Sequence, residues 1–314
     1  MTLTEEIKNL ARVVGFELVG VTTAEPLEDA DRLREWIDSG YHAGMQWMER
    51  QVEKRENPRN VVPDAQSIIV VAQNYYTAHQ HSERPQYGKI SRYAWGDDYH
   101  KIIEIRLKQL YEEIRKIAPE AEGRYYVDTG PVSEKSLAVR AGIGWQGKHG
   151  NIITREFGSW IFLGVLLLNL PLDADQPARD LCGDCTACIE ACPTQAIPMP
   201  YVVDSNRCIS YLTIEHRGEL TPDFSQAQQG WVFGCDICQD VCPWNRFQQS
   251  TEDTRFAPRV HNLQPKLADL INMSNDDFRN NYRHSPVKRA KWTGLVRNAE
   301  SVLRGINQNC EKSI

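Results

Sequence analysis

The stretch Cys182-Gly-Asp-Cys185-Thr-Ala-Cys188-Ile-Glu-Ala-Cys192-Pro193 decides how this chain is organised. Its spacing, C-x2-C-x2-C-x3-C-P, is the bacterial pattern for [4Fe–4S] ligation, in which three thiolates bind one cluster and the cysteine before proline binds the other. A second half follows, with a lone Cys208 and then Cys235-Asp-Ile-Cys238-Gln-Asp-Val-Cys242-Pro243. Together the two halves predict a bacterial-ferredoxin-like domain that holds two [4Fe–4S] clusters.

The crossing of the last cysteine in each half assigns the ligands. We expect cluster 1 on Cys182, Cys185, Cys188 and Cys242, and cluster 2 on Cys192, Cys208, Cys235 and Cys238. A single zinc site would use four cysteines in paired C-x2-C runs and would leave the remaining spacing unexplained. A disulfide framework would need an oxidising compartment, and the N-terminal residues do not read as a signal peptide. Cys310 has no partner motif and is expected to be a plain thiol.

Length and composition favour a soluble globular protein with more than one domain. The chain has 314 residues, of which 41% are hydrophobic and 25% charged. The longest apolar run, residues 160–168, is too short to span a bilayer. We therefore expect a cytoplasmic protein that does not contact a membrane and acts as a monomer. The net charge of −6 argues against a non-specific nucleic-acid coat but is compatible with a local basic patch.

Hydrophobic patterning of the first part predicts a mixture of strands and helices, hence an α+β class. We expect domains at 1–172, 173–250 and 251–314, the last a helical tail. Helices are predicted at 4–14 with Thr4 as N-cap, at 27–39, from about His100 to Pro119, and after Asp128, with Pro131 in the first turn. Strands are predicted at 16–22, 67–73, 125–127, 151–154 and 160–168, with the last two forming a hairpin.

Asp128 lies where a predicted strand meets a predicted helix, in the run Val127-Asp128-Thr129-Gly130-Pro131. If an apolar cofactor covered this carboxyl, loss of water would raise its pKa and make it a proton donor. The alternative is that Asp128 only caps the next helix. The chain contains neither G-x-G-x-x-G after a strand nor a P-loop, so NAD and ATP are not indicated.

Motifs spread over nearly the whole chain resemble those of the epoxyqueuosine reductase family, the cobalamin-dependent enzymes that complete queuosine in tRNA. They are Lys54-Arg55-x-x-Pro58, Arg92-x-x-Trp95-Gly96-x-Asp98-Tyr99-His100, the Asp128 run, Arg140-Ala-Gly-Ile-Gly144, both cysteine runs, and Arg207-Cys208-Ile-Ser210-Tyr-Leu-Thr213. The cysteine runs alone would be typical of any ferredoxin-like domain. The joint set is specific to the family.

The resemblance implies an N-terminal α/β cobalamin-binding domain, with nitroreductase-like layers, that holds the corrinoid above a cluster. It implies that Asp128 is the catalytic proton donor. Corrinoid contacts are implied at Arg55, Ser91, Asp128, Ile152, Leu163, Ser210 and Asp236. Asp98, Tyr99 and His100 would lie near the substrate. Lys135 takes the place of an arginine of several relatives, which keeps the charge but loses the two-pronged donor.

The implied partners are a tRNA carrying epoxyqueuosine and an external electron donor of the flavodoxin or ferredoxin type. Removal of the epoxide oxygen as water needs two electrons and two protons. A basic tail supplies candidate phosphate contacts at Lys288, Arg289, Lys291 and Arg297, although such a run can also be a solvated helix face. The competing interpretations are a reductive-dehalogenase-like enzyme acting on small molecules and a non-catalytic electron carrier.

Overall fold

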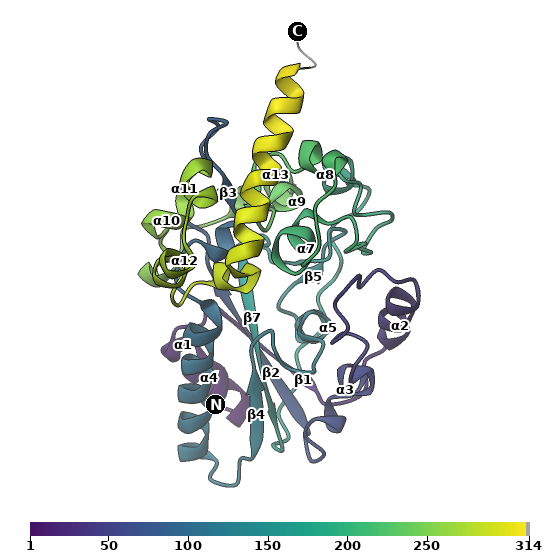
Figure 1. The fold of residues 1–314 in the computed structure, drawn as a ribbon. Coiled ribbons are helices and arrows are strands. Elements are labelled where there is room, and N and C mark those ends of the chain that lie inside the picture. The colour runs from purple at the N-terminus through teal and green to yellow at the C-terminus, as the bar shows by residue number, and fades with distance from the viewer. Residues whose placement is uncertain (312–314) are drawn as a thin grey trace.

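The computed structural model describes residues 1–311, with side chains up to Gln308. A four-stranded antiparallel sheet forms the centre of the first half (Figure 1). Its order is β1 (Leu18–Thr23), β2 (Ser67–Asn74), β7 (Ile161–Leu168) and β4 (Gly123–Tyr126). Both central strands are continuous apolar runs, because helices cover each face of the sheet and neither face meets water.

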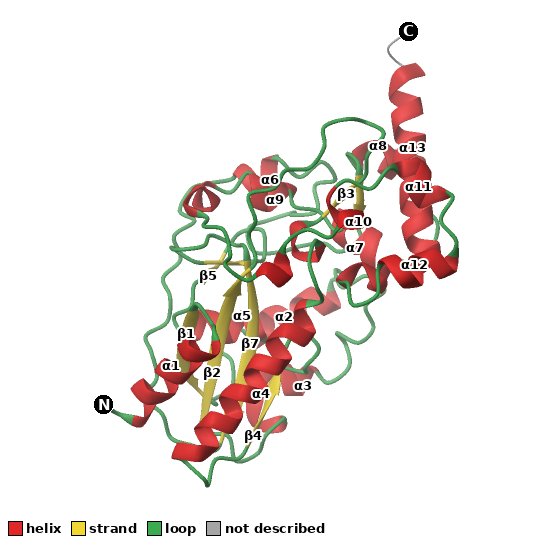
Figure 2. Cartoon of the chain, turned by 90° about the vertical axis from the view of Figure 1, so that its left-hand side faces the viewer, coloured by secondary structure: helices red, strands yellow, loops and turns green. Residues whose placement is uncertain are grey.

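Helices α1 (Leu3–Val14) and α4 (Tyr99–Ile117) cover one face of the sheet, and α5 (Glu134–Arg140) covers the other. Alternate residues of β2 point to opposite sides, so Ile69 packs in the α1–α4 core and Ile68 in the α5 core. Figure 2 shows α4 lying along the sheet. Two short helices, α2 (Ala30–Asp38) and α3 (Val52–Glu56), lie beyond α5 in Figure 1.

The cysteine-containing region consists of short helices joined by loops. They are α6 (Ala187–Glu190), α7 (Ile209–Ile214), α8 (Pro222–Ala227) and α9 (Ile237–Asp240). Strand β8 (Trp231–Phe233) pairs in parallel with β3 (Lys89–Ile90) from the first half of the chain. A second small sheet joins β5 (Trp145–Gln146) to β6 (Ile152–Ile153). Single turns of 3-10 helix lie at Pro58–Asn60, Arg92–Ala94, Pro243–Phe247, Thr254–Phe256 and Pro286–Ala290.

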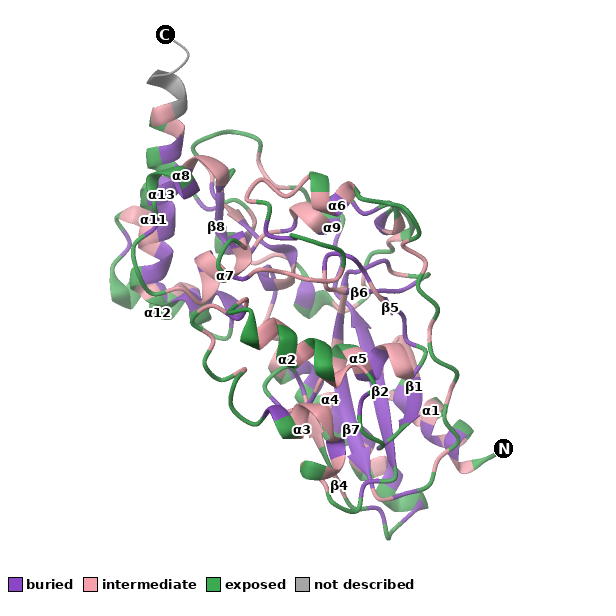
Figure 3. Cartoon of the chain, turned by 90° about the vertical axis from the view of Figure 1, so that its right-hand side faces the viewer, coloured by how far each residue is buried: buried purple, intermediate pink, exposed green. Residues whose placement is uncertain are grey.

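The tail contains α10 (Val260–Leu263), α11 (Leu267–Ile271), α12 (Asn275–Asn281) and the long α13 (Lys291–Glu311). It packs in one hydrophobic core with β8 and with Ile90 and Trp95 of the first half. Figure 3 shows the buried stripe that α13 contributes. Because this core takes side chains from all three expected domains, the limits at 172 and 250 do not coincide with separate cores. They remain predictions.

The mixed α+β class is confirmed, and three local predictions were wrong. Helix α1 is capped by Thr2, which forms a capping box with Glu5, whereas Thr4 is buried inside the helix. Helix α5 begins at Glu134, so Pro131 lies in the loop before it. The expected hairpin is absent, because 151–154 supplies β6, which pairs with β5, and β7 pairs with β2 and β4.

No helix among the described residues is long and apolar enough to cross a membrane. The expectation for Cys310 concerns a side chain outside the described residues.

Candidate functional site

Asp128 lies in the loop between β4 and α5 with a left-handed backbone, at φ 58°. This conformation is uncommon for residues other than glycine and often marks a functional site. The loop is held from both sides: the Asp128 amide donates to Glu134 Oε1 at 2.7 Å, and a Cβ on Gly130 would approach the Tyr126 ring to 2.5 Å. Because the N-cap of α5 is Ser133, Asp128 does not cap that helix.

The Asp128 carboxylate meets the start of α4. Tyr99 donates its hydroxyl to Asp128 Oδ2 at 2.8 Å, and His100 Nε2 lies 3.3 Å from the same oxygen. The other ring nitrogen of His100 is 2.7 Å from Asp98 Oδ1, and Asp98 is also the N-cap of α4. Four residues that the sequence analysis singled out are thus brought together in one hydrogen-bonded chain: Asp98, Tyr99, His100 and Asp128.

In this hydrogen-bonded chain of side chains, the histidine is the protonated group and the two carboxylates are ionised. Burial alone would lower the pKa of His100, but its bonds to Asp128 and Asp98 outweigh this effect and raise the pKa to about 9. Burial would raise the pKa of Asp128, but the bonds from His100 and Tyr99 outweigh it and hold that pKa below its ordinary value. In the protein alone, Asp128 is therefore ionised, opposite to the neutral form expected beneath a cofactor.

Two further charged groups flank Asp128. Burial and the neighbouring Asp128 charge raise the pKa of Glu134 to about 8. Lys135 donates to the Gly150 carbonyl at 2.7 Å, and burial lowers its pKa against the opposing charges of Asp128 and Cys238. The Asp128 side chain is nevertheless 63% exposed, so it faces a recess rather than a packed interior. We call Asp98, His100, Asp128, Glu134 and Lys135 the proton recess.

A second carboxylate, that of Asp236, differs from Asp128 in its burial and its hydrogen-bond partners. Asp236 is fully buried and accepts the Ser91 hydroxyl and the Arg92 amide, the latter at 2.9 Å. Burial, followed by the charge of Asp240, raises the pKa of Asp236 to about 7. Tyr93 lies between the two carboxylates: burial raises its pKa well above normal, and the charges of Asp128 and Asp236 both add to the shift.

The remaining expected corrinoid contacts lie on several different elements. Arg55 donates to the Gly130 carbonyl at 3.3 Å, while its buried Nε has no hydrogen-bond partner within the protein. Ser210 lies in α7, two residues after Cys208. Ile152 is buried in β6, and Leu163 lies on β7.

The eight motif cysteines are all free thiols, and their assignment to two ligand sets stays a prediction. Burial raises the pKa of Cys188 to about 11, and the thiols of Cys242, Cys182 and Cys185 add to the shift. In the second set, burial raises the pKa of Cys235, with contributions from Cys238 and Cys208. Burial also raises the pKa of Cys208, and the charge of Cys192 adds to that shift. Among the described residues, no three His, Cys, Asp or Glu side chains could hold a single metal ion.

Comparison with known proteins identifies the family of this chain. Residues 55–129 match the family described as epoxyqueuosine reductase QueG, DUF1730, and residues 181–245 match the 4Fe-4S double cluster binding domain. The chain is 50% identical to the epoxyqueuosine reductase of Synechocystis over 286 residues, which covers 90% of this chain and 98% of that protein. This chain belongs to the epoxyqueuosine reductase family. The [4Fe–4S] clusters predicted from the cysteine pattern are those of its double-cluster domain.

Relatives of known structure have the same fold. A crystal structure of an epoxyqueuosine reductase with an epoxyqueuosine-modified tRNA-Tyr stem loop has a TM-score of 0.90 at 33% identity, covering 96% of this chain and 81% of that one. The Bacillus subtilis enzyme, at 31% identity, 0.90 and the same coverage, is described with its catalytic aspartate loop swung out of the active site. The Escherichia coli enzyme is 40% identical over 305 residues, covering 96% of this chain and 80% of that protein.

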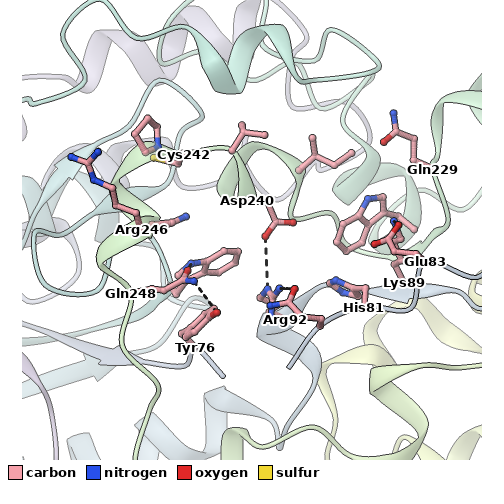
Figure 4. Close-up of a pocket in the computed structure, with 17 residues that line it drawn as sticks. Tyr76, His81, Glu83, Lys89, Arg92, Gln229, Asp240, Cys242, Arg246 and Gln248 are labelled. Atoms are coloured by element: carbon pink, nitrogen blue, oxygen red, sulfur yellow. Dashed lines mark hydrogen bonds and ion pairs between the residues drawn. The ribbon is translucent and has the colours of Figure 1, made fainter. Parts of the chain in front are cut away.

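A polar pocket of about 600 Å³ is lined in part by Cys242, a predicted ligand of cluster 1 (Figure 4). Arg92 lies at its base, 3.8 Å from Asp240 and stacked 4.8 Å from the centre of the Trp95 ring. The pocket rim includes exposed Val241 and Arg246. None of the proton-recess residues lines it.

The four basic residues of the tail differ in their surroundings. Arg297 donates to the carbonyls of Leu212, His216 and Gly218, so its guanidinium braces the end of α7. Arg289 pairs with Glu215 at 2.7 Å. This bond raises the pKa of Arg289. The charge of Asp128 adds to the shift, so Arg289 interacts electrostatically with a member of the proton recess. Lys288 and Lys291 are exposed.

Sequence reasoning missed Glu134 and Lys148. Glu134 looked like an ordinary acidic residue in the first turn of a helix, although its position six residues after Asp128 placed it on the same loop. Lys148 looked like part of a pliable glycine segment, yet its side chain reaches the loop of cluster 1.

Proposed function

We propose that this chain carries out its family's reaction with cobalamin bound beside the proton recess, and so reduces epoxyqueuosine in tRNA to queuosine. The observation that carries this proposal is the position of Lys135 and Asp128. Lys135 responds electrostatically both to Asp128 and to the cluster-2 thiols Cys238 and Cys208. Proton-donating groups and electron-delivering groups therefore lie close to one region of the protein.

Polar groups around this region fit a large cofactor. The buried Arg55 Nε has no protein partner, and such a donor is costly unless a ligand satisfies it. Cobalamin in its reduced form supplies a strong nucleophile and two electrons. The side chains proposed to hold it are those of Arg55, Ser91, Asp128, Ile152, Leu163, Ser210 and Asp236.

Proton delivery is the task of the recess. The departing epoxide oxygen must receive two protons, and two groups beside Asp128 hold protons near neutral pH: His100, with a pKa of about 9, and Glu134, with a pKa of about 8. We assign Asp128 as the group that hands a proton to the oxygen. His100 reloads it through the 3.3 Å contact with Oδ2. Asp98 keeps the imidazole oriented.

The direct test is a reaction of anaerobically purified, cluster-loaded protein with tRNA containing epoxyqueuosine. With added cobalamin and a chemical reductant, nucleoside analysis should show loss of one oxygen and appearance of queuosine. Conversion without cobalamin would remove the cofactor from the proposal. No conversion with cobalamin would favour the small-molecule reductase or carrier alternatives.

We further propose that the external electron donor delivers electrons to cluster 1. Ligand Cys185 is exposed. Val241 and Phe247, on either side of Cys242 in the sequence, are 38% and 44% exposed. Redox partners commonly dock through small interfaces, and an acidic flavodoxin or ferredoxin would be attracted by Arg246.

Arg246→Glu should therefore slow turnover driven by reduced flavodoxin by about tenfold, the scale of a lost rim charge in steering, and leave turnover driven by a chemical reductant unchanged. Arg115→Glu, an exposed change on α4, is the matched control. Equal rates with flavodoxin in wild type and Arg246→Glu would place the docking surface elsewhere. For the tRNA we propose contact through Lys288 and Lys291, and we treat the enzyme as a cytoplasmic monomer.

A further inference from the structure

Lys148 is a buried lysine in the loop between β5 and β6, with 8% of its surface exposed. Its Nζ donates to the carbonyl oxygens of Gly183 at 2.6 Å and of Cys185 at 3.0 Å. Both carbonyls belong to the C-x2-C loop of cluster 1. The side chain of one residue from the first half thus holds the cluster-1 loop by two hydrogen bonds.

In the described part of the chain, Lys148 forms no ion pair with a carboxylate. Of the two acidic residues at this loop, Asp184 is exposed, and Asp180 accepts the Cys182 amide at 2.7 Å and the Tyr201 hydroxyl. A buried ammonium without an opposite charge costs several kcal/mol. Carbonyl dipoles satisfy its donors but do not neutralise it.

The group able to compensate this charge is the cluster itself. A [4Fe–4S] cluster with four thiolate ligands carries a net negative charge, and reduction adds one more electron. A fixed positive charge beside it stabilises the reduced form more than the oxidised form, and nearby charge is one of the factors that set cluster potentials.

We propose that Lys148 is a positioning residue that raises the reduction potential of cluster 1 relative to cluster 2. Its side chain acts on the loop between Cys182 and Cys185, and among the described residues no contact joins it to a cluster-2 ligand. Cluster 1 thereby accepts electrons from a weaker donor than it otherwise would. The inference depends on the clusters but not on cobalamin or tRNA. Its failure would therefore leave the proposed function intact, and failure of the proposed function would leave the inference intact.

The test is a redox titration of cluster-loaded protein, followed by electron paramagnetic resonance of the reduced clusters. Lys148→Met removes the charge and the hydrogen bonds, whereas Lys148→Gln removes the charge and keeps donors for the carbonyls. Both should make cluster 1 about tenfold harder to reduce at a fixed potential, which is ~59 mV for a one-electron couple. Lys148→Arg should restore the wild-type value. A Cys185→Ser variant identifies the cluster-1 signal.

Lys8→Met is the matched control, because Lys8 is also partly buried but is paired with Asp175 at 2.6 Å. It should leave both potentials unchanged. A shift in Lys148→Met but not in Lys148→Gln would show that hydrogen bonds, not charge, matter, and would overturn the proposal. So would unchanged potentials in both variants, or loss of half the iron in both, which would make Lys148 a clamp for the loop alone.

Discussion

The proton recess and the cluster-1 loop handle buried charge in opposite ways. In the recess, His100 lies between two carboxylates, and each proton has a neighbour to move to. In the cluster-1 loop, Lys148 faces only carbonyl oxygens among its hydrogen-bond partners and has no acid to exchange with. The first arrangement suits groups that must change protonation during a reaction. The second suits a charge that must stay constant while electrons pass.

Removal of cluster 2 should separate the two regions and have the largest effect. Cys208→Ala takes away a ligand of the cluster nearer to the recess, so iron content should fall by up to half and turnover should be lost. The cluster-1 signal and its potential should persist, because its four ligands and Lys148 are intact. Iron analysis and electron paramagnetic resonance measure both results. Loss of both signals would mean that the clusters assemble only together.

Asp128→Asn should disable the recess without altering the electron route. Asparagine can still accept the Tyr99 hydroxyl but cannot transfer a proton, so single-turnover reduction of epoxyqueuosine should slow by about 10²-fold or more. Cobalamin should still bind, because asparagine keeps the size and hydrogen bonding of the side chain, and both cluster potentials should be unchanged. A near wild-type rate would assign the acid to another member of the recess, and His100→Gln and Glu134→Gln would then be compared.

Unlike the charges of the recess and the cluster-1 loop, those of the tail lysines are exposed, so salt screens them. Replacing Lys288 and Lys291 by glutamine should weaken tRNA binding by about tenfold at low salt and reduce the salt slope by about 2, one for each phosphate contact. Glutamine at Lys108 and Lys116, exposed on α4, provides the control. An unchanged slope would identify the tail as a solvated helix face.

Stability should depend on pH through the recess. The folded state holds a proton on His100, with a pKa of about 9, and on Glu134, with a pKa of about 8, against ordinary values of 6.5 and 4.5. Between about pH 6.5 and 9 the folded chain therefore binds more protons than the unfolded chain, and stability falls as pH rises. Melting temperatures of cluster-loaded protein should show this fall. The double variant His100→Gln/Glu134→Gln should flatten it, and a flat wild-type curve would contradict the assignment.

Local pattern was enough to predict the parts of the fold that depend on continuous apolar runs. The strand predicted at 67–73 is β2, and the strand at 160–168 is β7 with one residue fewer at its start. Pairing was harder. Ile152 and Ile153 form too short a run to specify a partner, and the choice of β5 over β7 depends on tertiary packing.

The chemistry was predicted unevenly for a related reason. Cysteine spacing predicts ligation directly, and the double-cluster domain that residues 181–245 match agrees with two [4Fe–4S] clusters. Protonation depends on neighbours that are distant in sequence. The pKa of Asp128 is lowered by bonds from α4, about thirty residues earlier, so its direction could not be read from the Asp128 run alone.

The pairing of β3 with β8, and the core that Ile90 and Trp95 share with α11 and α13, has a consequence for synthesis. Trp95 leaves the ribosome 172 residues before Leu267, the start of α11. At ordinary rates of elongation that interval is roughly 10–30 seconds. During that interval Trp95 can contact His81 and Arg92 but lacks the tail residues of the core that it shares with α11 and α13. The last helices must therefore be made before β8 gains its full packing, because Val232 and Phe233 share this core with the tail.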